Sequence, residues 1–235
     1  AGRGRAAGGA GEGRAPKLDD TTAVRLAGVA LLGFLWSMGS LMVLSTLPVF
    51  LKETLGVSNT RIGLLEGFAI FGSSSSKILA GMASDALGSR VRVIAVGAIA
   101  TFLVKFVFVA APLVHVLCGT GVAFAVVVGG KILDRMAKGV RGAPTDALLA
   151  DLSSPARRSQ AYALNQSASN AGALLGTLSA TALMVLSRGS LTVTFSGALI
   201  PCLAAVFVLL LIVKEQEDEV KARQAGAAAA GGLAG

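Results

Sequence analysis

The chain has 235 residues, of which 54% are hydrophobic and only 14% are charged, and its mean hydropathy is +0.73. Soluble domains carry about 25% charged residues, so the composition excludes an ordinary soluble protein and indicates a membrane protein. The net charge of +8 does not indicate nucleic-acid binding, because the basic residues lie at the ends of apolar runs with almost no aromatic residues among them.

Residues 1–22 form a tail rich in glycine, alanine and arginine, which cannot bury a core and is expected to be disordered. Beyond it lie apolar runs long enough to cross a hydrocarbon core of ~30 Å, which takes about 20 helical residues. The runs cover residues 24–51, 62–84, 91–114, 117 onward, 160–186 and 191–213.

None of these runs alternates as the strands of a membrane barrel do. We therefore expect an all-α integral membrane protein, a six-transmembrane-helix bundle over residues 23–213. Residues 214–235 turn charged and then low in complexity, as in a cytoplasmic linker or tail, and we expect further sequence beyond them.

Lysine and arginine are unevenly divided between the two ends of the predicted spans. Twelve lie on the side that holds both tails, whereas only Lys52, Arg61 and Arg188 lie on the other side. Because basic residues favour the cytoplasmic side, we predict that both termini are cytoplasmic, without a prediction of which membrane.

A short turn, GMASDALGSRVRV at 81–93, joins the second and third predicted spans. Gly81 would let another helix approach closely, and Gly88 would permit the chain to reverse. Asp85 could accept hydrogen bonds and complement a helix dipole, while Arg90 and Arg92 could reach headgroups or carboxylates. An ordinary basic turn is the alternative interpretation.

The spacing G-x-x-x-D-x-x-G-x-R resembles the signature turn of the major facilitator superfamily of secondary transporters, where it gates the cytoplasmic face. Residues 47–67 and 149–167 are similar to the family's connections between helices 1 and 2 and helices 4 and 5. A bacterial-type branch is matched by Glu66-Gly67, by Lys77 and by DRMAKGVRGAPTD at 134–146. The chain departs from the family pattern at Ala86, Ser89, Ala137 and Thr145.

The resemblance covers residues 28–213. It implies the N-terminal six-helix half of a twelve-helix transporter, with the second half missing from this chain or supplied by a partner. The resemblance also implies alternating access, in which two bundles rock about a central site.

Three charged residues fall within the predicted spans, where each costs about 3 kcal/mol or more at the bilayer centre. Glu66 and Lys77 are eleven residues apart and so share a helix face. Lys105 lies in the same outer half as Glu66, so we expect a Glu66–Lys105 pair. The alternative is that Glu66 and Lys77 extend to the two membrane interfaces.

The richest charged segment is residues 131–146, and its charges fall on one face of a helix. Hydropathy alone would end the fourth helix near residue 133. The resemblance implies a helix to about residue 150 whose charged face lines the translocation cavity, with Lys131 at the position of a family cation. The alternative is a solvated interfacial helix with an Asp134–Lys138 pair. The charges on this face are Lys131, Asp134, Arg135, Lys138, Arg141 and Asp146.

The fifth span carries Gln166 and Asn170 near its predicted cytoplasmic start, with Ser154 and Pro155 as a natural helix beginning. Gly172 and Gly176 have the spacing that permits close packing of two helices. Antiporters of the family place proline where this chain has Thr177, which argues against antiport.

The resemblance implies a secondary active transporter of a small solute, coupled to protons or another ion, with membrane lipid around it and no nucleic-acid partner. The net positive charge of the 131–146 face favours anionic or zwitterionic substrates. No nucleotide-binding loop, metal cluster or catalytic triad is recognisable, so we expect no enzyme activity, cofactor or metal. The alternatives are a homodimeric six-helix half-transporter or channel, and a non-transporting membrane scaffold.

Overall fold

The computed structural model describes residues 20–87 and 90–212, and within these ranges every regular element is a helix. The all-α fold predicted from the apolar runs is therefore confirmed. The two tails and Gly88 lie outside the described residues. The elements are α1 (Asp20–Val49), the π-helix η1 (Phe50–Thr54), α2 (Asn59–Leu87), α3 (Arg90–Leu152), α4 (Arg158–Leu186) and α5 (Leu191–Gly197).

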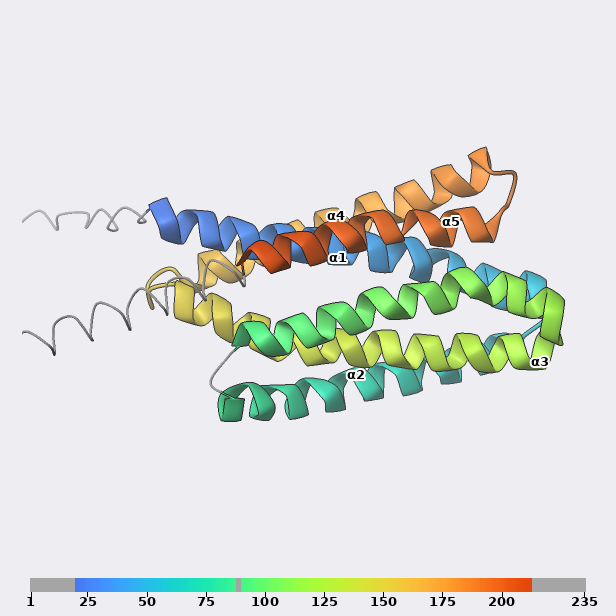
Figure 1. Ribbon diagram of the computed structural model, residues 1–235, viewed down its shortest axis with the longest axis horizontal. Helices are drawn as coiled ribbons and strands as arrows, with labels where there is room; N and C mark the ends of the chain where they lie inside the picture. The colour runs from blue at the N-terminus through green and yellow to red at the C-terminus, as the bar shows by residue number, and fades with distance from the viewer. Residues whose placement is uncertain (1–19, 88–89, 213–235) are drawn as a thin grey trace, which may run out of the picture.

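The 63-residue α3 is two rods rather than one, because its backbone reverses at Gly119. Gly119 has φ of 83° and ψ of 174°, which a residue with a side chain rarely adopts. Figure 1 shows the first rod (residues 90–118) turning back at this point into the second rod (residues 120–152), which runs beside it. The first rod thus extends past its predicted end near residue 114.

Within the described residues, four helices are long and apolar enough to cross a membrane: Ala23–Thr54, Arg90–Leu152, Arg158–Leu186 and Leu191–Ile212. The last of these is α5 together with the helix that resumes after a turn at Ala198. Helix α2 is not among them, since Glu66, Lys77 and four consecutive serines lower its hydropathy. The count of six spans stays a prediction.

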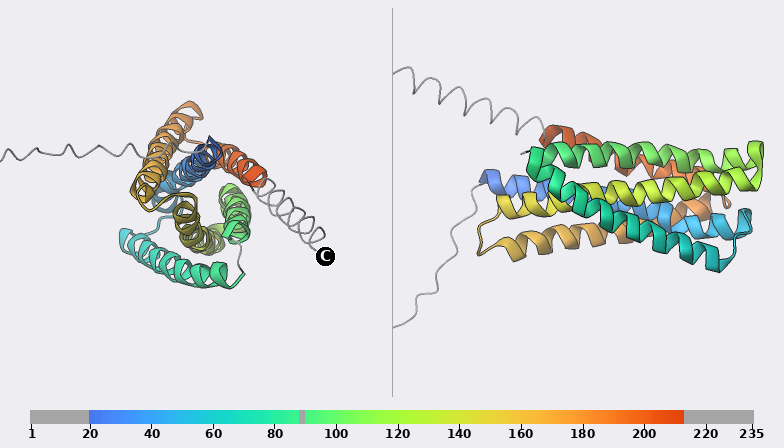
Figure 2. Two further views of the ribbon diagram at one scale, coloured as in Figure 1. Left: turned by 90° about the vertical axis from the view of Figure 1, so that its left-hand side faces the viewer. Right: turned by 90° about the horizontal axis from the view of Figure 1, so that it is seen from below.

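The helices form an elongated bundle in which α1 packs chiefly along α4, and α2 packs chiefly along α3. Seen along the bundle, α1 lies between α4 and the α5 segment, and α2 lies at the opposite side beside α3 (Figure 2). Residues 20 and 212 lie at the same end of the bundle, which we call the terminal end. This arrangement agrees with the prediction that the chain enters and leaves the bundle on one side. That this side is cytoplasmic stays a prediction.

Two apolar clusters fill the interior. One includes Leu47, Phe50 and Phe195, and the rings of Phe50 and Phe195 meet edge to face with 6.2 Å between their centroids. The other includes Trp36 and Leu149. The outer surface is also apolar, as expected where lipid rather than water surrounds a bundle: Phe71 is 72% exposed and Leu186 is 80% exposed.

Two glycines of α4 bring its backbone against α1. A Cβ atom at Gly172 would collide with the carbonyl oxygen of Phe34, and one at Gly176 with that of Met38. The close packing predicted from their spacing is confirmed, and it follows from the small-residue contacts that membrane helices use. The predicted beginning of this helix at Ser154 and Pro155 is wrong, because those residues belong to a turn and α4 begins at Arg158.

Candidate functional site: a charged cluster along α3

The second rod of α3 continues as helix through the charged segment to Leu152. The end near residue 133 that hydropathy alone indicated is therefore wrong, and the longer helix implied by the resemblance is confirmed. The rod touches α2 backbone to backbone, since a Cβ at Gly139 would collide with the carbonyl oxygen of Ser73. This close approach brings the charges of α2 within reach of those on the rod.

Seven charged residues of α2 and α3 lie together inside the bundle or at its edge, and we call them the charged cluster. It contains five cations and two carboxylates, an excess of positive charge in an apolar setting. Its members are Glu66, Lys105, Lys131, Asp134, Arg135, Lys138 and Arg141.

Lys105 of the first rod pairs with Asp134 of the second rod. The Lys105 Nζ donates a hydrogen bond to the Asp134 Oδ1 at 2.7 Å, and the side chains are 0% and 3% exposed. The expected Glu66–Lys105 pair is therefore wrong. Lys105 points between the two rods of α3, whereas Glu66 lies on α2, on the side of the second rod.

Glu66 instead faces two cations of the second rod, one helical turn apart. Its Oε2 lies 2.7 Å from the Lys131 Nζ, and its Oε1 lies 3.7 Å from the Arg135 Nη2. The Lys131 side chain is 1% exposed, the Arg135 side chain 20% and the Glu66 side chain 43%. The contact with Lys131 is a close ion pair without the angles of a good hydrogen bond, so Glu66 Oε2 remains without a hydrogen-bond partner.

Arg141 is buried and has no carboxylate partner among the described residues. Its Nη1 donates a hydrogen bond to the Thr101 Oγ1 at 2.9 Å. Its guanidinium lies over the ring of Trp36, with 4.4 Å between the Cζ and the ring centroid. A cation over an aromatic face is stabilised by the ring quadrupole, so a ring and a hydroxyl replace the missing carboxylate.

Lys138 is the exposed cation of the charged cluster and forms no ion pair within the described part of the chain. The alternative of a solvated interfacial helix with an Asp134–Lys138 pair is contradicted, because Asp134 is buried and bound to Lys105. The charged face of the second rod is therefore mostly buried, and among its cluster residues only Arg135 and Lys138 are exposed, Arg135 in part.

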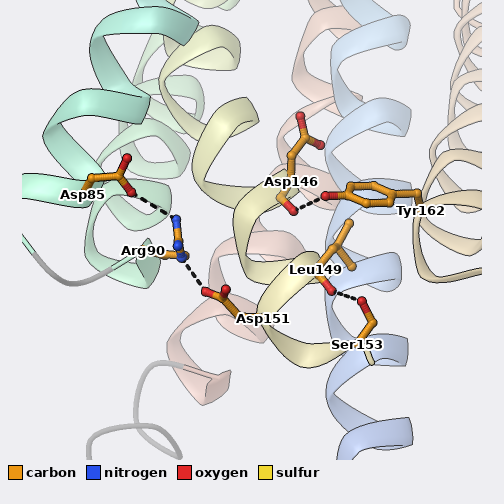
Figure 3. A network of polar contacts seen from close by, with 7 residues as sticks. All are labelled: Asp85, Arg90, Asp146, Leu149, Asp151, Ser153 and Tyr162. Carbon is orange, nitrogen blue, oxygen red and sulfur yellow. Dashed lines mark hydrogen bonds and ion pairs between the residues drawn. The ribbon is translucent and has the colours of Figure 1, made fainter. Parts of the chain in front are cut away.

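Toward the terminal end, Lys77 of α2 donates a hydrogen bond to the Asp146 Oδ2 on α3 at 2.8 Å. Glu66 and Lys77 thus both meet the second rod, which confirms that they share a face. Asp146 also accepts a hydrogen bond at its carbonyl oxygen from the Tyr162 hydroxyl of α4 at 2.8 Å (Figure 3). Asp146 therefore joins α2 to α3 through its carboxylate and α4 to α3 through its backbone carbonyl.

The predicted gating turn also reaches the second rod. Figure 3 shows Arg90 between two carboxylates: its Nε is 2.5 Å from the Asp151 Oδ2, and its Nη1 is 3.4 Å from the Asp85 Oδ1. A Cβ atom at Gly81 would be in ordinary van der Waals contact with the side chain of Ala143 on the same rod. Arg92 is exposed.

The family model of the Major Facilitator Superfamily matches residues 29–232, most of the chain. The chain belongs to the Major Facilitator Superfamily. It is also 29% identical over 192 residues to an uncharacterized MFS-type transporter of Methanocaldococcus jannaschii. The alignment covers 80% of this chain and 45% of that relative, so the chain spans less than half the length of the relative.

As a Major Facilitator Superfamily member with long apolar helices, the chain is an integral, multi-pass membrane protein. The predicted cavity residues form two separate groups: the charged cluster of α2 and α3, and a polar pair on α4 in which Gln166 donates a hydrogen bond to Asn170 at 3.0 Å. Both α4 residues are exposed, and no hydrogen bond joins them to the charged cluster in the described part of the chain. Residues 20–87 and 90–212 contain no group of ligands suited to a metal ion.

Four residues that make these hydrogen bonds, stacks or ion pairs were not singled out in the sequence, and one of them is Tyr162. Trp36 and Thr101 hold Arg141, and each looks like an ordinary core residue in an apolar run. The position of Asp151 could have been recognised in the sequence. An acidic side chain at a helix C-terminus interacts unfavourably with the helix dipole, so a nearby cation is expected to compensate it. Arg90 supplies that cation.

Proposed function

We propose that this Major Facilitator Superfamily protein is a secondary active transporter that moves a small anionic or zwitterionic solute by alternating access. The observation that carries the proposal is the charged cluster, in which five cations lie near only two carboxylates within an apolar bundle and three of the cations pair with them. Charges inside a membrane protein are costly, and they mark substrate and ion pathways. A positive excess favours a substrate that brings negative charge.

The open edge of the charged cluster is the part that a solute would meet. Arg135 is partly exposed, Lys138 is exposed, and Glu66 lies half open beside them. In contrast, Lys105 and Asp134 neutralise each other in the interior. We therefore assign Arg135 and Lys138 to substrate contact, Lys131 to the floor of the site, and the Lys105–Asp134 pair to support.

Alternating access would require this bundle to rock against a second six-helix half around a site near the middle of the membrane. The transporter of Methanocaldococcus jannaschii supports that expectation, because the alignment with this chain covers only 45% of its length. The turn at Asp85 and Arg90 would act at the cytoplasmic end, where Arg90 ties α2 to the second rod. Gln166 and Asn170, exposed on α4, are offered as further cavity residues.

The test is uptake by the full-length protein in proteoliposomes, with a panel of anionic, zwitterionic, cationic and neutral solutes, with and without a proton gradient. Lys138→Ala is the informative variant, since Lys138 forms no ion pair in the described residues and its removal should not disturb folding. Lys52→Ala, at an exposed position in η1, is the matched control.

We expect uptake of an anionic or zwitterionic solute, reduced at least about tenfold by Lys138→Ala, which corresponds to about 1.4 kcal/mol. Lys52→Ala should leave uptake unchanged. Uptake restricted to cationic or neutral solutes would remove the substrate class, and unchanged uptake in Lys138→Ala at equal protein levels would remove the residue assignment.

A further inference from the structure

An apolar groove lies on the surface of the bundle between the first rod of α3 and the beginning of α5, which lie side by side (Figure 1). Its volume is about 750 Å³, and it is lined by six apolar residues of the first rod, from Phe106 to Val116, together with Thr192 of α5. Those six residues recur at helical spacing and share one face of the rod. None of the lining residues belongs to the charged cluster, so the groove is separate from the proposed solute site.

The lining of the groove decides what can fill it. Thr192 has the only polar side chain among the described residues that line it. Water does not fill a space that offers it so few hydrogen-bond partners. An empty groove would lose the van der Waals contacts along its walls. In a membrane protein, a fatty acyl chain is the ligand that such a surface fits.

The groove has the position and length of one leaflet of a bilayer. Val116 lies three residues before the reversal at Gly119, and Thr192 follows the turn between α4 and α5. The groove therefore starts at this end of the bundle, which we call the reversal end, and runs inward to Phe106. The ten residues from Val116 to Phe106 span about 15 Å of helix, half of a hydrocarbon core of ~30 Å.

Arg188, in the turn between α4 and α5, places a charge at the reversal end. Helix α4 ends in a Schellman motif, in which the Gly189 N–H donates to the Met184 carbonyl oxygen at 2.8 Å and the Arg188 N–H to that of Val185 at 3.2 Å. Arg188 therefore adopts the left-handed conformation, with φ of 54°, at a position where glycine is usual.

The turn itself gives no reason for an arginine at residue 188, since glycine would adopt this conformation with less strain. The Arg188 side chain is exposed and forms no ion pair within residues 20–87 and 90–212. Thr192 of the groove lies one helical turn further along the chain. A guanidinium binds a phosphate through two parallel N–H donors, so a lipid headgroup is a suitable partner.

We propose that the groove binds one phospholipid of the leaflet at the reversal end, with an acyl chain between the first rod and α5 and the phosphate at Arg188. The inference goes beyond the proposed function and does not depend on it. Lipid tails are as apolar as the groove, so hydrophobicity alone does not retain this lipid. Retention comes from the fit of the chain and from the charge of Arg188, and it favours a lipid with net negative charge.

The experiment counts the lipid molecules retained by the full-length protein in detergent, by native mass spectrometry. Phosphatidylglycerol offers acyl chains and a phosphate, whereas diacylglycerol with the same chains offers the chains alone. Ala110→Trp fills the groove from an exposed position of its lining. Val96→Trp is the matched control, because Val96 is 64% exposed on the same rod and does not line the groove. Arg188→Gly removes the charge and introduces the residue that the turn favours.

We expect the wild type and Val96→Trp to retain one phosphatidylglycerol, with a preference of about fivefold over diacylglycerol, the contribution of one arginine near a membrane surface. Arg188→Gly should lose that preference and retain diacylglycerol as the wild type does. Ala110→Trp should retain neither lipid. The unfolding midpoint of Arg188→Gly without lipid should equal or exceed that of the wild type, which separates lost binding from a folding defect.

Equal retention of phosphatidylglycerol by the wild type, Ala110→Trp and Arg188→Gly would overturn the inference, because the retained lipid would then lie elsewhere. A dimer of this chain that Ala110→Trp abolishes would also overturn it, because a second copy rather than a lipid would fill the groove. Neither result affects the proposed function, which is tested by uptake into proteoliposomes.

Discussion

Lys105 and Asp134 form a buried ion pair between the two rods of α3, with 2.7 Å between the Nζ and the Oδ1. The Lys105 Nζ also lies 5.7 Å from the centroid of the Phe108 ring, so little water reaches the pair. A pair of this kind holds the two rods at a defined depth relative to each other.

Removing one partner of this pair leaves the other charge buried and uncompensated. We expect Asp134→Asn to lower stability by about 3–5 kcal/mol, as is usual when one member of a buried pair is lost. The measurement is the thermal unfolding midpoint of the full-length protein in detergent. The double variant Lys105→Met, Asp134→Leu should recover much of the loss, and a wild-type midpoint for Asp134→Asn would contradict the pair.

The contact between α1 and α4 depends on the absence of side chains at two positions. Gly172→Ala and Gly176→Ala should each force the helices apart, because a Cβ atom would meet the carbonyl oxygen of Phe34 or Met38. Strain of this kind costs about 1–3 kcal/mol or more, read as a fall in the unfolding midpoint. Gly67→Ala is the control, since it has open space around it and gains helix propensity. Equal midpoints for all three variants would exclude backbone contact at this interface.

Arg141 should be sensitive even to a change that keeps its charge. Arg141→Lys loses the planar stack on Trp36 and the directed hydrogen bond to Thr101. We expect a loss of about 1–2 kcal/mol in stability. Trp36→Phe should lose less, because a phenyl ring still presents a face to the cation. If Arg141→Lys unfolds at the wild-type temperature, the stacking does not contribute.

Arg90 should affect conformation more than stability. Its pairs with Asp85 and Asp151 are largely exposed, and exposed ion pairs contribute about 0–1 kcal/mol. We expect Arg90→Ala to change the unfolding midpoint little but to increase hydrogen–deuterium exchange at the end of α2, where the tie to the second rod is lost. Arg92→Ala, at an exposed neighbouring position, is the comparison. Identical exchange in both variants would argue against the tie.

The helices were predictable because membrane-spanning helices are long and apolar, and the glycine spacing of α4 predicted its contact with α1. The end of the second rod was not predictable from hydropathy. A hydropathy average treats Lys131 and Asp134 as charges in contact with water or lipid, whereas Glu66 and Lys105 neutralise them inside the bundle. Their partners lie 65 and 29 residues away in the chain, beyond any local window.

The predicted Glu66–Lys105 ion pair was wrong for a related reason. Depth along the helices placed Lys105 near Glu66, but the rotation of each helix about its axis decides which cation faces the carboxylate, and that cation is Lys131. That rotation depends on contacts such as Gly139 against Ser73, which no periodicity in a single helix indicates.

The reversal at Gly119 also bears on how the protein is made. Lys105 leaves the ribosome 29 residues before Asp134, the carboxylate that neutralises it. Entering lipid alone, the first rod would carry an uncompensated ammonium group at a cost of about 3 kcal/mol. The two rods are therefore expected to be released from the translocon as one hairpin, and the biosynthetic unit of this region is a pair of helices rather than a single one.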